Sequence, residues 1–287
     1  MLGELLIIGA TVLWGMSNIL LKMGIGRGME PGTANAVQTG TSAIFMVLIW
    51  LIVLFAGIIP FPVISLSSLL FLLVGTFVGL GLGTTLYLMG LKHIDASMAS
   101  PLSSTSPFFV IIMAILFLNE TVTALLIIGT VLIFLGVAFI GRNKGEKKVS
   151  RRGVILVGIA PLFWAVTVIC YKIALADMDV FTANAIRMTA LGLSLCIYVT
   201  LNGQGCMASG RKAFLLVSGA GMFNYVIGGT MFLVGLMMVG ASRASPISSG
   251  TPFFTMLFAY MFLKEKLKKS YILGGILIVA GVILISM

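Results

Sequence analysis

The segment ASMASPLSSTSPFF at residues 96–109 occurs a second time, as ASRASPISSGTPFF, at residues 241–254. A shift of 145 residues aligns 83–142 with 228–287 without a gap. Agreement of this length within one chain indicates an internal duplication and not chance. The expected number and orientation of the helices both depend on this duplication.

The duplication extends beyond this segment in both directions. The same shift aligns Phe117, Leu118 and Glu120 with Phe262, Leu263 and Glu265. It also aligns Gly129 and Gly136 with Gly274 and Gly281. A slightly different shift aligns Trp14 and Lys22 with Trp164 and Lys172. Another aligns the run Thr-Ala-Asn-Ala at 33–36 with the same run at 182–185. The chain therefore divides into a first repeat, 1–141, a basic linker, 142–152, and a second repeat, 153–287.

The composition is typical of a membrane protein. Sixty per cent of the residues are apolar and 9% are charged, whereas soluble domains carry about 25% charged residues. The net charge of +10 lies in basic residues between apolar spans and not on an exposed face, so lipids are expected as partners and nucleic acid is not. The start of the chain lacks a basic segment, so the first apolar run is expected to be a span and not a signal peptide.

A bilayer core about 30 Å thick takes roughly 20 helical residues. The long uncharged stretch 31–91 is divided by Pro60 and Pro62. Ten helices are expected, near 3–22, 33–57, 68–90, 97–118, 122–140, 153–172, 180–200, 213–238, 244–263 and 270–286. The predicted fold class is all-α and integral to the membrane.

Each repeat contains an odd number of expected helices, so the second repeat should enter the membrane from the opposite face. Two inverted five-helix repeats follow from this parity. Inverted repeats typically enclose a binding site near the midplane and expose it to the two sides in turn. This arrangement predicts a transporter that works by alternating access.

Loop charges give an expected orientation. Fifteen Lys and Arg residues fall in loops on one side, and two, Lys172 and Arg243, fall on the other. Because Lys and Arg loops tend to stay cytoplasmic, the linker 142–152 is expected inside and both termini outside.

Several motifs occur in a fixed order and largely in duplicate. They are Leu13-Trp14-Gly15 with Ser17-Asn18 and Lys22, the two Ser-Pro segments, and Asn119-Glu120 before a glycine-spaced helix. Together they resemble the EamA type of the drug/metabolite transporter superfamily over essentially the whole chain. The resemblance implies passage of small metabolites, often amino acids, nucleosides, sugars or cationic drugs and commonly outward, through the cell (inner or plasma) membrane.

Two features depart from that family. Its members often carry an Arg early in the second helix, where this chain has Gln38, and the matching Arg here is Arg187 in the second repeat. Members are also usually drawn with cytoplasmic termini, in disagreement with the loop charges. The absolute orientation therefore stays open at this stage.

Arg187 is the strongly ionised residue that falls well inside an expected span, about seven residues after the start near 180. Exposure to lipid would cost about 2.5–3.5 kcal/mol, so its side chain should face protein or water. One hypothesis is that it binds a carboxylate or phosphate of the substrate. The alternative is a structural arginine that reaches the interface or backbone carbonyls.

Polar and aromatic residues inside the spans are further candidates for a cavity. Trp14, Ser17, Asn18 and Leu21 share one face of the helix 3–22, and Trp164, Thr167 and Tyr171 share the matching face of 153–172. Hydrogen bonds between helices are the alternative use of such groups. The predicted substrate-binding residues are Trp14, Asn18, Tyr87, Ser103, Trp164, Arg187, Asn224, Tyr225 and Ser248.

Each copy of the repeated segment carries two prolines, six residues apart. The first of each should follow a serine N-cap and begin a helix. The second should leave a serine carbonyl, Ser103 or Ser248, without its helical donor. The predicted hinge or kink residues are Pro101, Pro107, Pro246 and Pro252, with a static kink as the alternative.

Seven-residue glycine spacing in 122–140 and 270–286 predicts close helix packing and allows a homodimer contact through these two helices.

Lys22 and Lys172 are expected to complement helix ends or reach headgroups, with a role at a substrate entrance as the alternative. Glu120 and Glu265 are expected to stabilise the start of the helix that follows each of them.

The acidic residues all fall at span ends or in loops, so a proton antiporter with a buried shared acid is not expected. Facilitated diffusion or exchange is expected instead.

The spacing of metal sites is absent from the single His93 and from the three cysteines, Cys170, Cys196 and Cys206. No catalytic constellation is visible in the sequence either, so no metal, cofactor or enzyme activity is expected. A receptor or lipid-handling protein without transport is the remaining alternative.

The candidate residues also indicate a substrate class. A cavity of Trp, Tyr, Asn, Ser and Thr with one Arg suits a small zwitterion or a polar neutral solute. Amino acids are the first expectation, and sugars or nucleosides are the second.

Overall fold

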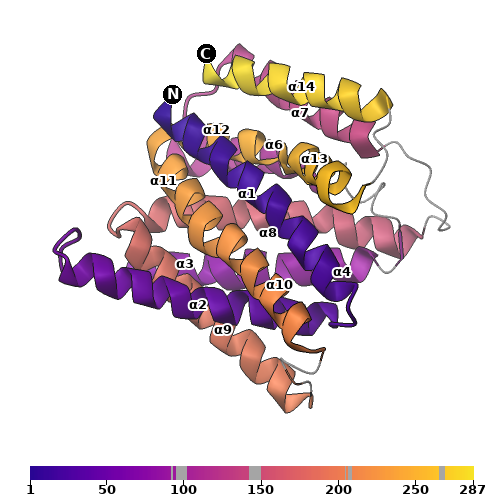
Figure 1. Cartoon of the computed structure of the whole chain (residues 1–287). Coiled ribbons are helices and arrows are strands. Elements are labelled where there is room, and N and C mark those ends of the chain that lie inside the picture. The colour runs from indigo at the N-terminus through magenta and orange to yellow at the C-terminus, as the bar shows by residue number, and fades with distance from the viewer. Residues whose placement is uncertain (92, 95–101, 142–149, 204, 206–208, 265–268) are drawn as a thin grey trace.

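The computed structural model describes residues 1–91, 93–94, 102–141, 150–203, 205, 209–264 and 269–287 (Figure 1). In this part of the chain all regular structure is helical. The first half forms α1 (Leu2–Ile25), α2 (Pro31–Phe55), α3 (Leu66–Gly75), η1 (Thr76–Gly83), α4 (Thr84–Leu91), α6 (Ser106–Leu118) and α7 (Ala124–Gly141). The second half forms α8 (Arg151–Ala174), α9 (Val180–Leu201), α10 (Arg211–Gly221), η2 (Met222–Gly228), α11 (Gly229–Val239), α12 (Ala241–Ser248), α13 (Thr251–Leu263) and α14 (Lys269–Ser286).

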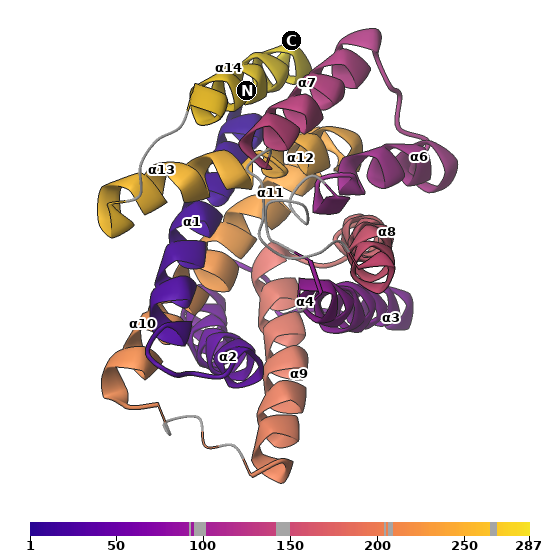
Figure 2. The same ribbon diagram turned by 90° about the vertical axis from the view of Figure 1, so that its right-hand side faces the viewer.

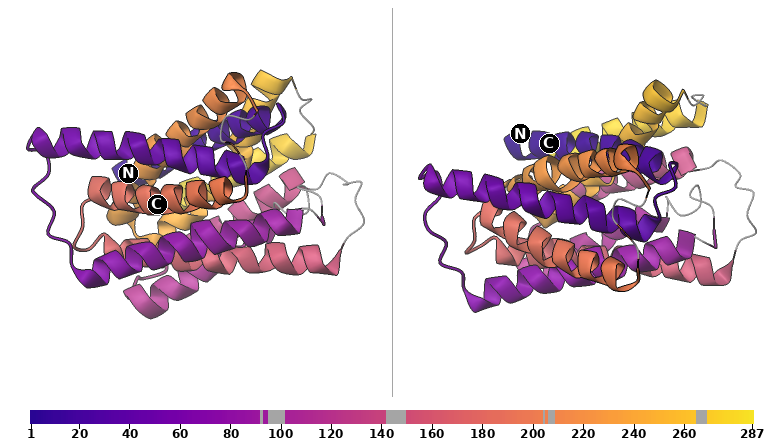
Figure 3. Two further views of the ribbon diagram at one scale, coloured as in Figure 1. Left: turned by 90° about the horizontal axis from the view of Figure 1, so that it is seen from below. Right: turned by 60° about the horizontal axis from the view of Figure 1, so that its bottom comes forward.

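The described helices fit a multi-pass membrane protein. Six of them are long and apolar enough to cross a bilayer, and α6, α7 and α14 are shorter and apolar. Many large apolar side chains on their outer faces are exposed, such as Ile44, Leu116 and Ile276, which suits a lipid environment. Figure 3 shows the long helices running in roughly the same direction, with the two chain ends near one another.

Two long helices contain a π-helical segment at equivalent places in the two halves. In the first half η1 joins α3 to α4, and in the second half η2 joins α10 to α11, within continuous helices over Leu66–Tyr87 and Arg211–Val239. The sequence predicted these two spans but not the π segments. Such segments shift the backbone pairing and are frequent at functional sites.

The proline segments end and restart a helix. In the second half α12 ends at Ser248, and α13 begins at Thr251 with Pro252 in its first turn. The first half has the same break before Pro107 in α6. Because proline lacks an N–H, Pro107 and Pro252 suit the first turn of a helix, where that N–H would have no partner within the helix. Pro101 lies outside the described residues.

The prediction that Ser245 and Pro246 begin a helix is wrong. Pro246 lies inside α12, which begins at Ala241 after Gly240. The physical reason is a cap that comes from the other half of the chain. The Glu120 carboxylate accepts hydrogen bonds from the backbone N–H of Ala241 and Ser242, at 2.8 and 2.9 Å, and from the Ser242 hydroxyl at 2.6 Å.

The glycine-spaced helices α7 and α14 pack against each other within one chain (Figure 2). A Cβ on Gly129 would lie 2.6 Å from the Gly281 carbonyl, and one on Gly136 would lie 2.6 Å from the Gly274 carbonyl. The predicted close packing is therefore confirmed. Because the glycine faces are occupied inside the chain, a homodimer through these helices would have to use their outer faces.

The pairing of the glycines shows that α7 and α14 run antiparallel, since the earlier glycine of each helix faces the later one of the other. The pair α2 and α9 is also antiparallel. Trp50, late in α2, donates to Thr182, early in α9, at 2.9 Å. At the other end the Cys196 thiol donates to the Ala36 carbonyl at 3.6 Å.

The two halves interlock instead of forming separate cores. Helix α1 packs on α10, α11 and α13 of the second half. Helix α8 packs on α3, η1, α4 and α6 of the first half. The main core joins side chains from both halves, with Ile7 and Val110 from the first beside Leu233 and Ile247 from the second. This interlocking places residues from both repeats around one central space.

Candidate functional site

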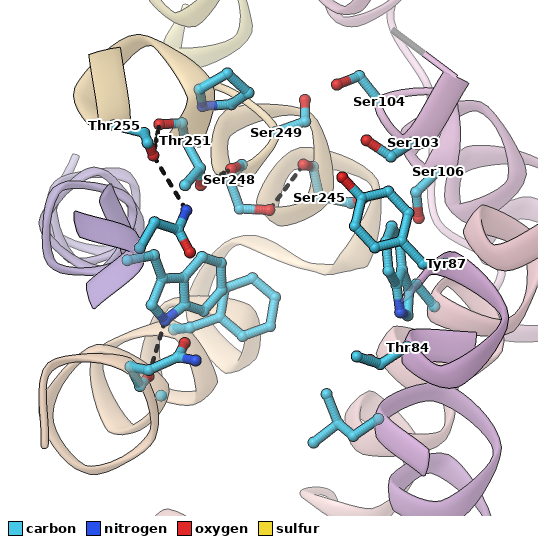
Figure 4. Close-up of a pocket in the computed structure, with 18 of the residues that line it drawn as sticks. Thr84, Tyr87, Ser103, Ser104, Ser106, Ser245, Ser248, Ser249, Thr251 and Thr255 are labelled. Atoms are coloured by element: carbon cyan, nitrogen blue, oxygen red, sulfur yellow. Dashed lines mark hydrogen bonds between the residues drawn. The ribbon is translucent and has the colours of Figure 1, made fainter. Parts of the chain in front are cut away.

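The central space is a cavity of about 720 Å³ between the two halves (Figure 4). All nine residues predicted to bind substrate line it, and so do Pro107 and Pro252. Pro246 is not among its lining residues. A volume of this size suits a small organic solute. The structure thus brings the predicted residues together, and their role in binding remains a prediction.

Arg187 is 5% exposed and lies in the cavity wall. Its Nε donates to the Asn184 side-chain oxygen at 2.7 Å, and its guanidinium lies 5.0 Å from the centre of the Tyr171 ring. The described residues supply no hydrogen-bond acceptor or carboxylate for its terminal nitrogens. Arg187 is therefore buried and held in place, with donors left for a ligand.

Asn184 connects Arg187 to the π segment η2. Its amide nitrogen donates to the Tyr225 carbonyl at 3.0 Å and to the Thr230 hydroxyl at 2.9 Å. A Cβ on Gly229 would lie 2.6 Å from a terminal nitrogen of Arg187, so this glycine allows the arginine its place. Asn184 was not among the predicted site residues, although it stands in the repeated Thr-Ala-Asn-Ala run.

The segment η2 also holds Asn224 and Tyr225 at the cavity. The Trp14 indole N–H donates to the Asn224 carbonyl at 2.8 Å. The π segment leaves carbonyls for side-chain donors, and here Trp14 and Asn184 supply them. A Cβ on Gly228 would lie 2.9 Å from the Trp14 nitrogen, so the close approach requires glycine. The Tyr225 hydroxyl has no hydrogen-bond partner in the described part of the chain.

In the first half, η1 meets α8 in a similar way. The Thr167 hydroxyl donates to the Gly75 carbonyl at 2.8 Å, next to the start of η1. Thr76 shares a hydrogen bond with the Tyr171 hydroxyl at 3.1 Å. A Cβ on Gly79 would clash with Thr167. Each π segment therefore packs against the first helix of the opposite half.

Aromatic pairs supply much of the apolar wall. Trp14 and Phe232 have ring centres 5.2 Å apart, and Tyr87 and Trp164 have ring centres 5.4 Å apart. Tyr87 also shares a hydrogen bond with Ser103. The first pair joins α1 to α11 and the second joins α4 to α8, so both pairs bridge the halves.

Hydroxyl groups line the cavity in two sets that face each other (Figure 4). One set comes from the first half and the other from the second. The first comprises Thr84, Tyr87, Ser103, Ser104 and Ser106, and the second comprises Ser245, Ser248, Ser249, Thr251 and Thr255. Thr255 also accepts a hydrogen bond from the Asn18 amide at 3.1 Å.

Two details differ from the sequence expectations. Ser17 is 1% exposed and donates to the Ala220 carbonyl at 2.9 Å, so it joins helices and does not line the cavity. The Ser248 carbonyl, expected to lack a donor before Pro252, accepts from the Thr251 hydroxyl at 2.7 Å. A side chain thus replaces the N–H that proline removes.

The cavity extends toward the ends of helices that lead into basic loops. Its lining reaches Lys22 in the last turn of α1, Ile140 late in α7 and the exposed Tyr260 late in α13. The loop charges predict that this end faces the cytoplasm, and this orientation remains a prediction. Lys22, for which the sequence analysis gave a role at a substrate entrance as an alternative, therefore lies at this end of the cavity.

The opposite end of the molecule is held by polar contacts between helix ends. Glu120 caps the start of α12, which corrects the expectation that it stabilises the helix after it. Lys172 donates to the carbonyls of Leu236 and Met237 at the end of α11, at 3.1 and 2.9 Å. Gly240, with φ +84, turns the chain between α11 and α12. Glu265 lies outside the described residues.

The chain is similar to a transporter family and to uncharacterized transporters over nearly its whole length. The EamA-like transporter family matches residues 1–142 and 151–287. An uncharacterized transporter of Archaeoglobus fulgidus is 23% identical, with 99% of this chain and 98% of that one covered. The uncharacterized transporter YoaV of Bacillus subtilis is 25% identical, with 96% and 94% covered.

A solved crystal structure has the same fold. It superposes with a TM-score of 0.81, covers 98% of this chain and 95% of its own, and is 14% identical in sequence. At that identity the likeness concerns the fold alone.

Proposed function

The chain belongs to the EamA-like transporter family, and from this premise we propose that it moves small polar metabolites across the cell membrane by alternating access. The proposed direction is export, and the proposed solutes are amino acids or related compounds. The observation that carries the proposal is the cavity between the halves, which gathers all nine predicted residues, among them the buried Arg187, whose terminal nitrogens have no acceptor among the described residues.

We further propose that the domains 1–141 and 153–287, joined by the linker 142–152, are inverted repeats. The antiparallel pairs of equivalent helices, α2 with α9 and α7 with α14, support this. So do the π segments at matching places and the reciprocal packing of α1 and α8 on the opposite half. An inverted pair around a central site is the arrangement that lets one site face the two sides in turn.

The two ends of the cavity support alternating access. One end reaches Lys22 and Tyr260, while the other is held by Glu120 and Lys172 on helix ends of α12 and α11. Opening the held end requires these capping bonds to break and the packing of α12 on α1 and α6 to loosen. The Glu120 bonds join the first half to the second, whereas the Lys172 bonds join α8 to α11 within the second half, so a rocking of the halves would break the Glu120 bonds.

Counterflow in liposomes tests transport directly. Purified protein is reconstituted with an unlabelled amino acid inside, and uptake of the same labelled amino acid is followed. Transient accumulation above the outside concentration is expected for a carrier. Absence of counterflow for amino acids, nucleosides and sugars alike would overturn the transport proposal for these classes.

Arg187→Gln tests the site, because it places the residue of the first half, Gln38, in the second. A charge-assisted hydrogen bond is worth about 1.5–3 kcal/mol, so counterflow should fall by about tenfold or more. Arg211→Gln is the matched control, since Arg211 is exposed at the start of α10. Equal counterflow in the two variants would remove Arg187 from the site.

The two sets of hydroxyl groups that line the cavity favour a second candidate class of solute. Serine and threonine hydroxyls both donate and accept, so they suit sugars or nucleosides. Counterflow of a nucleoside or sugar that survives Arg187→Gln but fails in Ser103→Ala and Ser248→Ala would favour this class.

A further inference from the structure

The cavity has an uneven charge. Among its described lining residues the ionised side chains are Lys22 and Arg187, and none is Asp or Glu. The described acids are engaged elsewhere. Glu4 pairs with the N-terminus at 2.7 Å, Glu120 caps α12, and Asp177 and Asp179 bond the starts of α3 and α9. Glu30 lies at the start of α2 and is not a lining residue.

This charge pattern selects against cations. In a space walled by protein, charges are screened less than in water, so the positive charge of the buried Arg187 repels a positive ligand. An ammonium group entering the cavity meets no described carboxylate. A carboxylate meets the terminal nitrogens of Arg187, which the described residues leave without acceptors.

The geometry around Arg187 is that of an anion site. A guanidinium binds a carboxylate through two parallel hydrogen bonds when its plane is fixed. Here the bond to Asn184 at 2.7 Å and the Tyr171 ring 5.0 Å away fix that plane. The Tyr225 hydroxyl, in the same wall, is a further donor without a described partner.

The rest of the cavity indicates what is attached to the anion. Two aromatic pairs, Trp14 with Phe232 and Tyr87 with Trp164, offer flat apolar surfaces from the two halves. Such surfaces bind an apolar or aromatic body.

We propose that the solute accepted here is a small organic anion, with one carboxylate and an apolar or aromatic body, and without an ammonium group. The inference rests on the proposed transport function and narrows its solutes to carboxylates related to amino acids. It assigns the carboxylate to Arg187 and Tyr225 and the body to the aromatic pairs.

Binding to matched series of compounds tests the charge preference. The full chain in lipid nanodiscs is titrated at neutral pH with phenylacetate, phenylglycine, benzylamine and the neutral phenylacetamide. A second series contains isocaproate, leucine and isoamylamine. The expected result is that the carboxylate of at least one series binds about tenfold or more tightly than its amino acid, and that the amines do not compete with it. Equal or tighter binding of an amine or amino acid, or no carboxylate binding in either series, would overturn the proposal.

Two variants of Arg187 and one control variant keep the test specific. Arg187→Gln should abolish the preference for phenylacetate over phenylacetamide, while Arg187→Lys should keep the preference at lower affinity because it retains charge without the planar fork. Arg211→Gln should bind as the unaltered chain does. A preference unchanged in Arg187→Gln would place the anion elsewhere and overturn the assignment.

Counterflow separates this inference from the function on which it rests. Transport of leucine with no preference for isocaproate would overturn the anion inference and leave transport standing. Binding of the carboxylates without counterflow of any solute would overturn transport and leave the anion site standing.

Discussion

The Trp14 indole N–H donates to the Asn224 carbonyl at 2.8 Å, across 210 residues of sequence. This bond ties the first helix of the chain to the π segment of the other half, at the wall of the cavity. Trp14 therefore contributes both a ring to the apolar wall and a donor to a backbone carbonyl. The two contributions can be separated by substitution.

Trp14→Phe keeps an aromatic ring and removes the donor. Polar contacts between helices in membranes average about 0.6 kcal/mol, so a small loss of thermal stability is expected, together with weaker solute binding because η2 loses its anchor. Trp50→Phe is the control, since Trp50 donates to Thr182 at 2.9 Å outside the cavity. Both variants should lose similar stability, measured by thermal denaturation in detergent. Weaker binding in both, or in neither, would contradict the role given to Trp14.

Asn184→Ala removes the residue that links Arg187, η2 and Thr230. Asn184 is fully buried, and leaving buried polar groups unpaired costs about 1–3 kcal/mol each. A clear fall in melting temperature and in solute affinity is expected. Asn202→Ala, at the exposed end of α9, should change neither. Normal affinity in Asn184→Ala would show that Arg187 holds its place without this link.

Glu120→Ala removes three hydrogen bonds at the start of α12. Loss of an N-cap costs about 0.5–2 kcal/mol, and the end of the cavity that Glu120 holds should open more often. A cysteine placed at the buried Ala241 reports on this, because a maleimide should label it faster in the Glu120→Ala background. Glu30→Ala, before α2, is the control. Equal labelling in the two backgrounds would mean that Glu120 does not hold this end closed.

Gly129→Ala should separate α7 from α14, because its Cβ would lie 2.6 Å from the Gly281 backbone carbonyl, which cannot move aside. Overpacking of this kind costs about 1–3 kcal/mol. Gly158→Ala in α8 is the matched control, since nothing lies within 4 Å of its Cβ and alanine favours helix by about 0.5–1 kcal/mol. In thermal denaturation, the melting temperature of Gly158→Ala should equal or exceed that of the unaltered chain. A stable Gly129→Ala would contradict the tight α7–α14 contact.

The sequence predicted the spans well because long apolar runs and the duplication leave few alternatives. It also predicted the cavity residues, since polar and aromatic side chains within a span must face protein or water. Arg187 and Asn224 were found in this way.

The sequence did not predict features that depend on contacts between distant segments. The early start of α12 depends on Glu120, which is 121 residues away from Ala241 in the chain. The π segments have no local signal beyond clustered glycines, and Asn184 looked like an ordinary helical polar residue. These features follow from tertiary packing, which neither local propensity nor apolar periodicity records.

The interlocking of the halves also has a consequence for how the protein is made. Helices α1, α2 and α7 leave the ribosome before α9, α10, α11, α13 and α14, on which they pack. At about 5–20 residues per second, synthesis of the second half takes roughly 7–30 s. During that time the newborn first half resides in the bilayer with its Gly129 face uncovered and the Glu120 carboxylate without the start of α12. Insertion of the helices and their assembly are therefore separate stages, and the second stage cannot be completed before α14 arrives.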